Sequence, residues 1–576
     1  LIAGVWAVLG RLFWALSVVS GFALLLAGIN RTKLELRSEP LYPADSSFVS
    51  ESRSLLTMVD SQTVLGIVLA VVGTMVAVAV IGLLVGRRFP APRLRLAGGG
   101  LNRNLISVRL ITVMLSAALL GHATHFNQPG NLWRALYEPS ADWQPWSQAH
   151  NYRANGFVGG FLSNMPVGVM EQPAGYGPER LAEISQRYAE RAARINAGRT
   201  GSLTDANVII LLSESFTDPT WVDGIALAEN PIPQTQQLMS QTIAGTMYAL
   251  SYGGGTATME FESLTGQSVG LFKPQVTSPY SMFVADRSSY PSTVGAFAQL
   301  GHRTLAIHSY HLDMYKRRQA YKTLGFHEVI EEKNMQSRER LANSRYVSDA
   351  DTFSEVLYQL DRHEGPEFIN LLTMQNHGDY GGSFDDPIAS DITPPKKAEE
   401  YGQYARGLAH SDVALAEFLA QLQARDEPTI VAFYGDHQPG ILNDDPTSPD
   451  LPDTAYTTPF FVWNSATNTA QSVPAIGPAM LLPLLYESAE APVPPYVALL
   501  DEVRRTVPVI QPGRTLDAEG LPVTLDDLDD RTAALMDDLR MVQYDFSAGQ
   551  LVGPFVHGIF DSRTRFVGTL DLVGDR

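Results

Sequence analysis

Hydrophobic residues are distributed very unevenly along this chain. Long apolar runs occupy its first part, at residues 12–29, 64–85 and 105–120. Each run is long enough to cross the hydrocarbon core of a bilayer as a helix. The remainder shows only short apolar runs, separated by polar and amphipathic stretches. We therefore predict a helical membrane region over residues 1–123, followed by a part that lies in water.

The short apolar runs of the second part are typical of buried strands. They lie at 208–212, 304–308, 368–373, 429–434 and 460–463. A strand that is apolar at nearly every position is expected in a parallel sheet covered on both faces. Stretches with helical periodicity alternate with these strands, at 179–197, at 256–266, from 348 onward and at 404–423. This order predicts an α/β domain with a mostly parallel sheet sandwiched by helices.

Candidate chemistry follows four of these strands. His308 ends the run 304–308, and Asn376 and His377 come shortly after the run 368–373. Glu214 comes just after the run 208–212, and Asp436 and His437 come just after the run 429–434. The carboxyl ends of parallel strands meet at one edge of a sheet, where ligands usually bind. Together with the hydroxyl of Thr256, the side chains that follow the runs 208–212 and 429–434 form an oxygen-rich set with one imidazole. Such a set suits a divalent cation.

Thr256 follows three glycines and begins a predicted helix that Gly266 can end. A hydroxyl at a helix N-terminus lies where the dipole and the free N–H groups favour an anion. That position suits a nucleophile that attacks a phosphoryl group. A simpler interpretation is that Thr256 is an ordinary N-cap. On the helix at 404–423, Asp412 either orients a metal ligand or reaches water at the rim.

Composition and charge exclude several functions. The chain has no cysteine, which removes disulfides, thiolate nucleophiles and thiolate metal sites. Its formal charge of −19 argues against a nucleic-acid partner.

The charges between the second and third apolar runs predict the orientation in the membrane. This stretch contains basic residues and no acidic one: Arg87, Arg88, Arg93, Arg95 and Arg103. By the positive-inside rule the stretch is cytoplasmic, so the third helix runs outward. We then expect a stalk and linker helix over 124–200 and a catalytic domain with a C-terminal subdomain over 201–576, both outside the membrane. Because the chain begins at Leu1 inside an apolar run, we also expect an N-terminal portion to precede it.

Four motifs resemble one protein family. The stretches 207–216, 253–262, 376–377 and 434–437 are similar to the lipoteichoic acid synthase family, and 538–545 resembles its C-terminal helix. That family includes phosphoglycerol transferases and belongs to the alkaline phosphatase and sulfatase superfamily. Its members typically have five membrane helices, of which the three seen here would be the last three. The resemblance implies an alkaline-phosphatase/sulfatase-like fold.

The resemblance also implies roles for particular residues. Glu214, Thr256, Asp436 and His437 would bind one divalent cation, manganese in the first place, with magnesium or zinc as alternatives. Thr256 would be the nucleophile. His377 and Arg317 would hold the glycerophosphate group, and His377 is placed to donate a proton to the leaving oxygen. Tyr315 stands where the best-known members have tryptophan.

The function implied is that of a multi-pass protein of the bacterial cell membrane with its catalytic domain on the outer face. It would move glycerophosphate from phosphatidylglycerol to a polymer, glycolipid or glycan acceptor through a glycerophosphoryl-threonine. A phosphoethanolamine transferase and a metal-dependent phosphodiesterase of the same superfamily are alternatives. A non-catalytic envelope protein that binds a lipid or polymer is an alternative from a different class.

Overall fold

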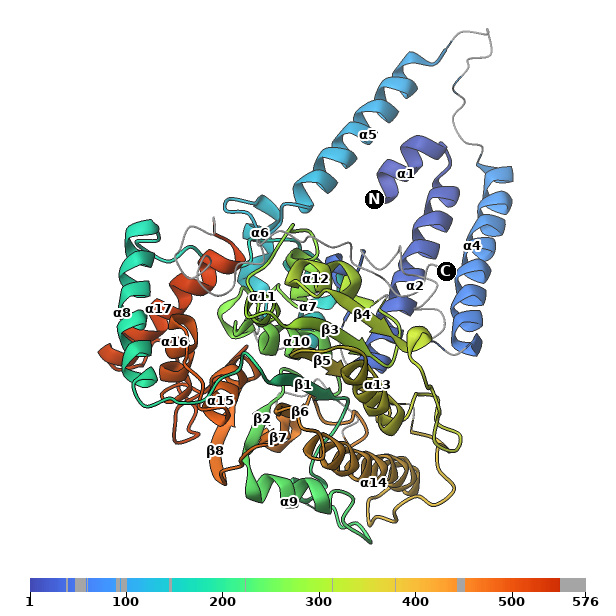
Figure 1. Cartoon of the computed structure of the whole chain (residues 1–576). Coiled ribbons are helices and arrows are strands. Elements are labelled where there is room, and N and C mark those ends of the chain that lie inside the picture. Colours follow the sequence, from blue (N-terminus) through green and yellow to red (C-terminus); the bar gives the residue numbers. More distant parts are fainter. Residues whose placement is uncertain are drawn as a thin grey trace. The chain divides into compact units, whose positions relative to one another are not determined.

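A computed structural model describes residues 1–37, 40–46, 59, 61–89, 94, 101–143, 148–222, 224–312, 314–378, 380–442 and 451–549 (Figure 1). The chain forms two compact units, Leu1–Val167 and Gly168–Arg576. Arg93 and Arg95 of the predicted cytoplasmic stretch lie outside the described residues.

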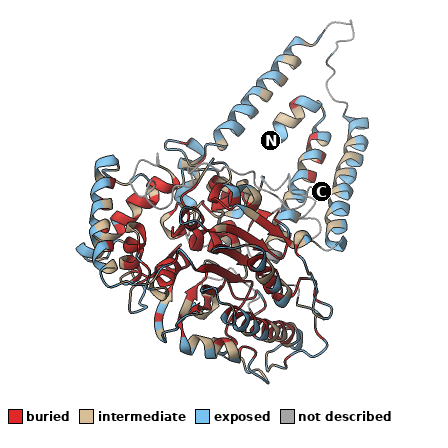
Figure 2. Cartoon of the chain, viewed as in Figure 1, coloured by how far each residue is buried: buried red, intermediate tan, exposed pale blue. Residues whose placement is uncertain are grey.

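The first unit is helical. Its α-helices are α1 Ile2–Leu9, α2 Leu12–Arg37, α4 Ser61–Arg88, α5 Arg103–Ala123, α6 Leu132–Tyr137 and α7 Gln148–Ser163. Three stretches are long and apolar enough to cross a membrane, namely Leu12–Leu34, Ser61–Arg88 and Arg103–Ala123. They contain the three predicted apolar runs. Neither α4 nor α5 has a buried residue (Figure 2), so both present apolar surface outward, as membrane helices do.

Arg109 is the one charged residue inside the third apolar run. Its guanidinium binds carbonyl oxygens at the C-terminus of α1. Its Nε donates to the Ala7 carbonyl oxygen at 2.5 Å, and its Nη2 donates to the Val8 oxygen at 2.7 Å. These carbonyls belong to the last turn of α1, where a cation complements the helix dipole.

The second unit is built on an eight-stranded sheet of order β4-β3-β5-β1-β6-β7-β2-β8. Its strands are β1 Asn207–Ser213, β2 Ile243–Tyr248, β3 Arg303–His308, β4 Glu328–Glu331, β5 Glu367–Leu372, β6 Thr429–Gly435, β7 Thr457–Asn464 and β8 Gln471–Ile476. Only the pairs β6–β7 and β7–β2 are antiparallel. The predicted mostly parallel sheet is confirmed. A separate two-stranded sheet pairs β9 Val509–Gln511 with β10 Arg514–Leu516.

Side chains of β1 alternate between two apolar cores, one on each face of the sheet. Val208, Ile210 and Leu212 belong to one core, whereas Ile209 and Leu211 belong to the other. This period of two, with apolar residues on both faces, explains why the run is continuously hydrophobic. The buried residues in Figure 2 follow the sheet and the helix faces turned toward it.

Helices cover both faces of the sheet. The first core includes residues of α8 Pro178–Asn196, α10 Thr256–Thr265, α11 Thr293–Gln299, α12 Arg317–Leu324, α15 Leu481–Ser488, α16 Pro495–Arg504 and α17 Asp530–Ser547. The second core includes α13 Asp349–Arg362 and α14 Pro395–Gln423, with α9 Pro233–Gln241 packed against it. The predicted helix sandwich is confirmed.

Some elements differ from the prediction. The strands β2, β4 and β8 were not expected, because β2 contains glycine and threonine, β4 is short, and β8 is a partly exposed edge strand with a proline. Helix α14 begins at Pro395, before the predicted start at 404, because its first turns are charged and carry little hydrophobic signal.

Candidate functional site

The register of two strands brings the two acidic candidates together. β1 and β6 are parallel neighbours, and Ser213 lies opposite Gly435. Glu214 and Asp436 directly follow these strands, so they lie side by side at the same edge of the sheet. A Cβ on Gly435 would lie 1.9 Å from the Phe216 carbonyl oxygen. Glycine is therefore required for this close approach.

Thr256 is held at the same point by the glycine run. Gly255, with φ 96°, is the N-cap of α10, and Thr256 is the first helical residue. The interpretation of Thr256 as an ordinary N-cap is therefore wrong. Its Oγ1 donates to Asp436 Oδ2 at 2.7 Å and lies 3.4 Å from Glu214 Oε2. The predicted end of the helix at Gly266 is confirmed.

His437 completes the group. Its Nε2 lies 3.3 Å from Asp436 Oδ2 and 3.5 Å from Glu214 Oε1. Its Nδ1 lies 3.0 Å from the Gln438 carbonyl oxygen, which can only accept a hydrogen bond. Nδ1 therefore carries the proton that it donates there, and Nε2 faces the carboxylates. Histidines that bind metals are held in the same way.

These side chains fit one metal ion. Glu214, Asp436 and His437 are all buried, and one ligand atom of each lies within 4.8 Å of the others. Burial raises the pKa of Asp436, and the charge of Glu214 raises it further. Burial would lower the pKa of His437, but the charges of Asp436 and Glu214 raise it. Two buried carboxylates this close are unfavourable unless a cation neutralises them.

Ser215 supports the same group, a role that no sequence pattern predicted. Its φ of 50° lies in the left-handed region, which a serine rarely adopts. This turn lets its N–H donate to Asp436 Oδ1 at 2.7 Å, while its hydroxyl donates to Glu214 Oε1 at 3.1 Å. Backbone strain of this kind often occurs at functional sites.

Arg317 and Tyr315 lie beside α10. The Nε of Arg317 donates to Glu260 Oε2 at 3.3 Å, and Arg317 is 4% exposed. Glu260 follows Thr256 by four positions, so both lie on one side of α10, one turn apart. The guanidinium carbon of Arg317 is 5.2 Å from the centre of the Tyr315 ring. Burial raises the pKa of Glu260, and the charge of Arg317 opposes that rise.

His377 has partners on two segments, Tyr346 and its own neighbour Gly378. Its Nδ1 lies 3.0 Å from the Tyr346 hydroxyl and 2.5 Å from the Gly378 carbonyl oxygen. His308, which ends the predicted strand 304–308, lies within electrostatic reach of both His377 and Arg317. Burial lowers the pKa of His308 well below its usual value, and Arg317 and His377 contribute to the lowering. Its position at the end of β3 was the only sequence signal for it.

Asp412 has a different role from either one expected. It is 1% exposed, so it does not reach water at a rim. Its two oxygens accept from the N–H groups of Gln234 and Thr235, at 3.0 and 2.7 Å. Asp412 therefore caps the N-terminus of α9, on a neighbouring element.

Comparisons with known proteins agree with this geometry. Residues 206–489, which contain Glu214, Thr256, Asp436 and His437, match the Sulfatase family model. We call these four residues the candidate metal-binding group. A protein of Rhizobium meliloti (strain 1021) named for cyclic beta-1,2-glucan modification is 26% identical over 570 residues, covering 95% of this chain and 84% of that protein. The capsular polysaccharide biosynthesis protein RkpI of the same organism is 29% identical over 243 residues, covering 40% of this chain and 41% of that protein.

A solved structure is also similar to this chain. The Streptococcus pyogenes phosphoglycerol transferase GacH, in complex with sn-glycerol-1-phosphate, matches with a TM-score of 0.60 and 28% identity. The match covers 68% of this chain and 99% of that chain.

Proposed function

We propose that this chain, whose residues 206–489 form a sulfatase-family domain of the alkaline phosphatase superfamily, is a membrane-anchored phosphoglycerol transferase. It would move glycerophosphate from phosphatidylglycerol to a glycan acceptor. The observation that carries this proposal is the Thr256 hydroxyl, at a helix N-terminus and 2.7 Å from Asp436 in a group that fits a metal. The names of the similar proteins, a phosphoglycerol transferase and a glucan modification protein, support the donor and acceptor classes.

Thr256 would be the nucleophile. Its oxygen forms a bond to the phosphorus of the lipid headgroup, and the bond from phosphorus to the diacylglycerol oxygen breaks. A divalent cation held by Glu214, Asp436, His437 and Thr256 would lower the pKa of the hydroxyl and neutralise phosphate charge. The N-terminus of α10 favours the same anion through its free N–H groups.

The remaining predicted residues would hold the phosphoglycerol group and move protons. Arg317, which pairs with Glu260 one turn along α10 from Thr256, would bind phosphate oxygens, and Tyr315 would shape the glycerol pocket beside it. His377 would donate a proton to the leaving diacylglycerol oxygen, and the proton that Thr256 gives up would replace it on His377. An acceptor hydroxyl then attacks the glycerophosphoryl-threonine and restores Thr256.

We propose Mn²⁺ as the ion, because the predicted ligands are mostly oxygens with one imidazole nitrogen. Reconstitution of metal-free protein with Mn²⁺, Mg²⁺ or Zn²⁺ in turn, followed by a turnover assay, would identify it. We also propose that the apolar helices cross the bacterial cell membrane and that the sulfatase domain lies on its outer face. The three apolar spans and the arginines 87, 88 and 103 flanking the second and third support this orientation.

The proposal is tested with the full chain in detergent, with headgroup-labelled phosphatidylglycerol and a cyclic β-1,2-glucan as substrates. We expect label on the glucan and release of diacylglycerol from the wild type. Thr256→Ala should lower turnover by at least about a thousandfold, as loss of a nucleophile does. Thr256→Ser keeps the hydroxyl and is the matched control. Transfer from phosphatidylethanolamine alone, or release of glycerophosphate to water alone, would contradict the proposal.

A further inference from the structure

Helix α6 of the first unit has an apolar side that is exposed in the described part of the chain. Leu132 is 61% exposed, Leu136 is 66% exposed and Trp133 is 37% exposed. At 3.6 residues per turn, these three side chains lie within about 100° of one another around the helix, and Arg134 lies on the far side. An exposed cluster of large apolar side chains indicates a contact with another molecule or with a membrane.

The other contacts of α6 fix its orientation within the first unit. The ring of Tyr137 packs edge-on against the buried ring of Phe126, with ring centres 6.1 Å apart. The Tyr137 hydroxyl donates to the carbonyl oxygen of Asn155, a residue of α7, at 2.7 Å. The exposed side of α6 therefore cannot turn inward unless these contacts are lost.

Hydrogen bonds tie the start of α6 to the end of α5. The Nδ2 of Asn131 donates to the carbonyl oxygens of His122 and His125, at 2.8 and 3.0 Å. The Leu132 N–H donates to His122 Nε2 at 3.1 Å. The Oδ1 of Asn131 accepts from the Arg134 N–H at 3.1 Å and so caps α6. Because His122 is in the last turn of α5, α6 begins directly beside the end of that helix (Figure 1).

The length of α5 indicates the level at which α6 lies. α5 has 21 residues, so at 1.5 Å per residue it is about 31 Å long. The hydrocarbon core of a bilayer is about 30 Å thick. A helix of this length that crosses the core ends at the boundary between the acyl chains and the headgroups. The start of α6, bonded to that end, then lies at the same boundary.

The side chains of α6 suit this boundary. Tryptophan is enriched there, because its ring is apolar while its indole N–H is polar. A helix with leucines on one side buries that side at the boundary and keeps its charged side chains among the headgroups. Arg134 forms an ion pair with Glu138 at 3.3 Å, and both side chains are exposed. Lipid is therefore the neighbour that both the position and the chemistry of α6 favour.

We propose that α6 lies in the outer surface of the bilayer, with Leu132, Trp133 and Leu136 inserted among the lipids. The inference rests on the proposed crossing of the membrane by α5, and it adds a second contact with the same bilayer. It identifies the partner of this apolar side as a lipid layer rather than a second copy of the chain. The bonds from Asn131 and Leu132 to the end of α5 would hold α6 at this level.

The chain has no cysteine, so a single introduced cysteine can carry a spin label. Leu136→Cys in the full chain is labelled with a nitroxide and reconstituted into vesicles of phosphatidylcholine and phosphatidylglycerol. We expect the label to collide more often with oxygen, which concentrates in lipid, than with a water-soluble nickel chelate. Its depth should be about 5–10 Å, as for other helices at this boundary. Arg134→Cys, on the far side of the same helix, is the matched control and should collide more often with the nickel chelate.

A label at Met114→Cys, near the middle of α5, separates this inference from the proposed membrane crossing, because it should be the deepest of all. If that label lies in lipid while the label at 136 collides mainly with nickel, the inference is overturned and the crossing stands. A label at 136 that is shielded from both reagents would overturn the inference too, because protein would then cover this side of α6. If the label at 114 does not lie in lipid, the crossing fails and the inference fails with it.

A second measurement needs no label and remains available if Leu136→Cys misfolds. Trp133→Phe should reduce the amount of tryptophan fluorescence that lipid brominated in its acyl chains quenches, because one lipid-exposed indole is removed. Equal quenching in Trp133→Phe and the wild type would contradict the insertion of α6.

Discussion

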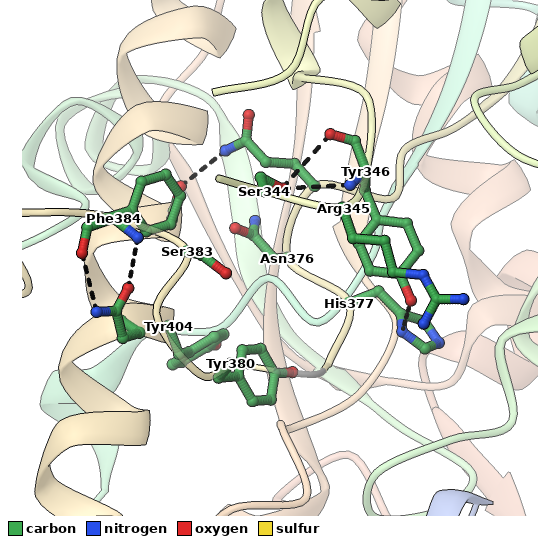
Figure 3. A pocket seen from close by; sticks show the side chains of 12 residues that line it. Ser344, Arg345, Tyr346, Asn376, His377, Tyr380, Ser383, Phe384 and Tyr404 are labelled. Carbon is green, nitrogen blue, oxygen red and sulfur yellow. Dashed lines mark hydrogen bonds between the residues drawn. The ribbon is translucent and has the colours of Figure 1, made fainter. Parts of the chain in front are cut away.

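The candidate metal-binding group and a small pocket lined by Tyr346, Asn376, Phe384 and Tyr404, among others (Figure 3), meet at Ser215, yet they are built in different ways. The group consists of charged side chains placed directly by the register of β1 and β6. The pocket consists almost entirely of neutral side chains, contributed by loops and by one helix. The difference suggests that the sheet edge fixes the reaction chemistry, while the surrounding loops choose the molecule that reacts.

The two regions also differ in how their polar atoms are satisfied. In the group, two buried carboxylates face each other and an imidazole, so a cation is the missing partner. In the pocket, the unsatisfied atom is the Asn376 carbonyl oxygen, so a hydrogen-bond donor is the missing partner. Changes in the first region should therefore stop the reaction for every acceptor. Changes in the second should leave the metal content unchanged.

The largest effect is expected from Asp436→Asn. The amide oxygen can still accept from the N–H groups of Ser215 and His437, at 2.7 and 2.8 Å in the wild type, so the local fold should persist. The negative charge is lost, and metal affinity should fall by at least about a hundredfold, since loss of even an outer hydrogen-bond partner costs 10–100-fold. Metal content measured by mass spectrometry after dialysis, together with turnover, checks this. Full metal retention with normal turnover would contradict the assigned group.

The next largest effect is expected at the buried ion pair between Arg317 and Glu260, which neutralise each other without a metal ion. Arg317→Ala leaves Glu260 buried without its cation, and the free energy of unfolding should fall by about 3–5 kcal/mol. Adding Glu260→Gln should recover part of this stability, because the uncompensated charge is removed. The double variant should still have a raised KM for phosphatidylglycerol, because the arginine that binds the phosphate is still missing. Denaturant unfolding and donor kinetics on both variants measure the two quantities, and full kinetic rescue by the double variant would show that Arg317 only stabilises the fold.

The smallest effect is expected at the boundary between the two regions. Tyr346→Phe removes the hydroxyl that lies 3.0 Å from His377 Nδ1 and leaves its ring in the pocket. One hydrogen bond contributes about 0.5–1.5 kcal/mol, so kcat should fall by about 2- to 10-fold with either KM little changed. Steady-state kinetics in both substrates measure this. An unchanged kcat would contradict this role of the Tyr346 hydroxyl.

The sequence predicted the metal-binding group because every part of it carries a local signal. Glu214 and Asp436 directly follow apolar runs, and Thr256 follows a glycine run that begins a helix. Parallel strands align their ends, so side chains far apart in sequence could be brought to one edge by topology alone. The parallel sheet itself was predictable from the same continuous apolar runs.

The rest depends on contacts between distant segments. The left-handed backbone of Ser215 is explained by its bond to Asp436, which no local pattern reveals. Asn376 and Gly407 meet only because α14 packs against the segment that follows β5. Edge strand β8 was missed because it is partly exposed and contains proline, so it lacks the apolar run by which the central strands were found.

The most direct test is the mass of the peptide that contains Thr256. The full chain is mixed with phosphatidylglycerol without an acceptor, quenched in acid and digested, with Thr256→Ala treated in parallel. We predict one added glycerophosphoryl group on Thr256 in the wild type, lost when the glucan is added before quenching, and none in the variant. A wild-type protein that turns over lipid while this peptide stays unmodified, or a variant that turns over lipid at the wild-type rate, would contradict Thr256 as the atom that takes the phosphoryl group.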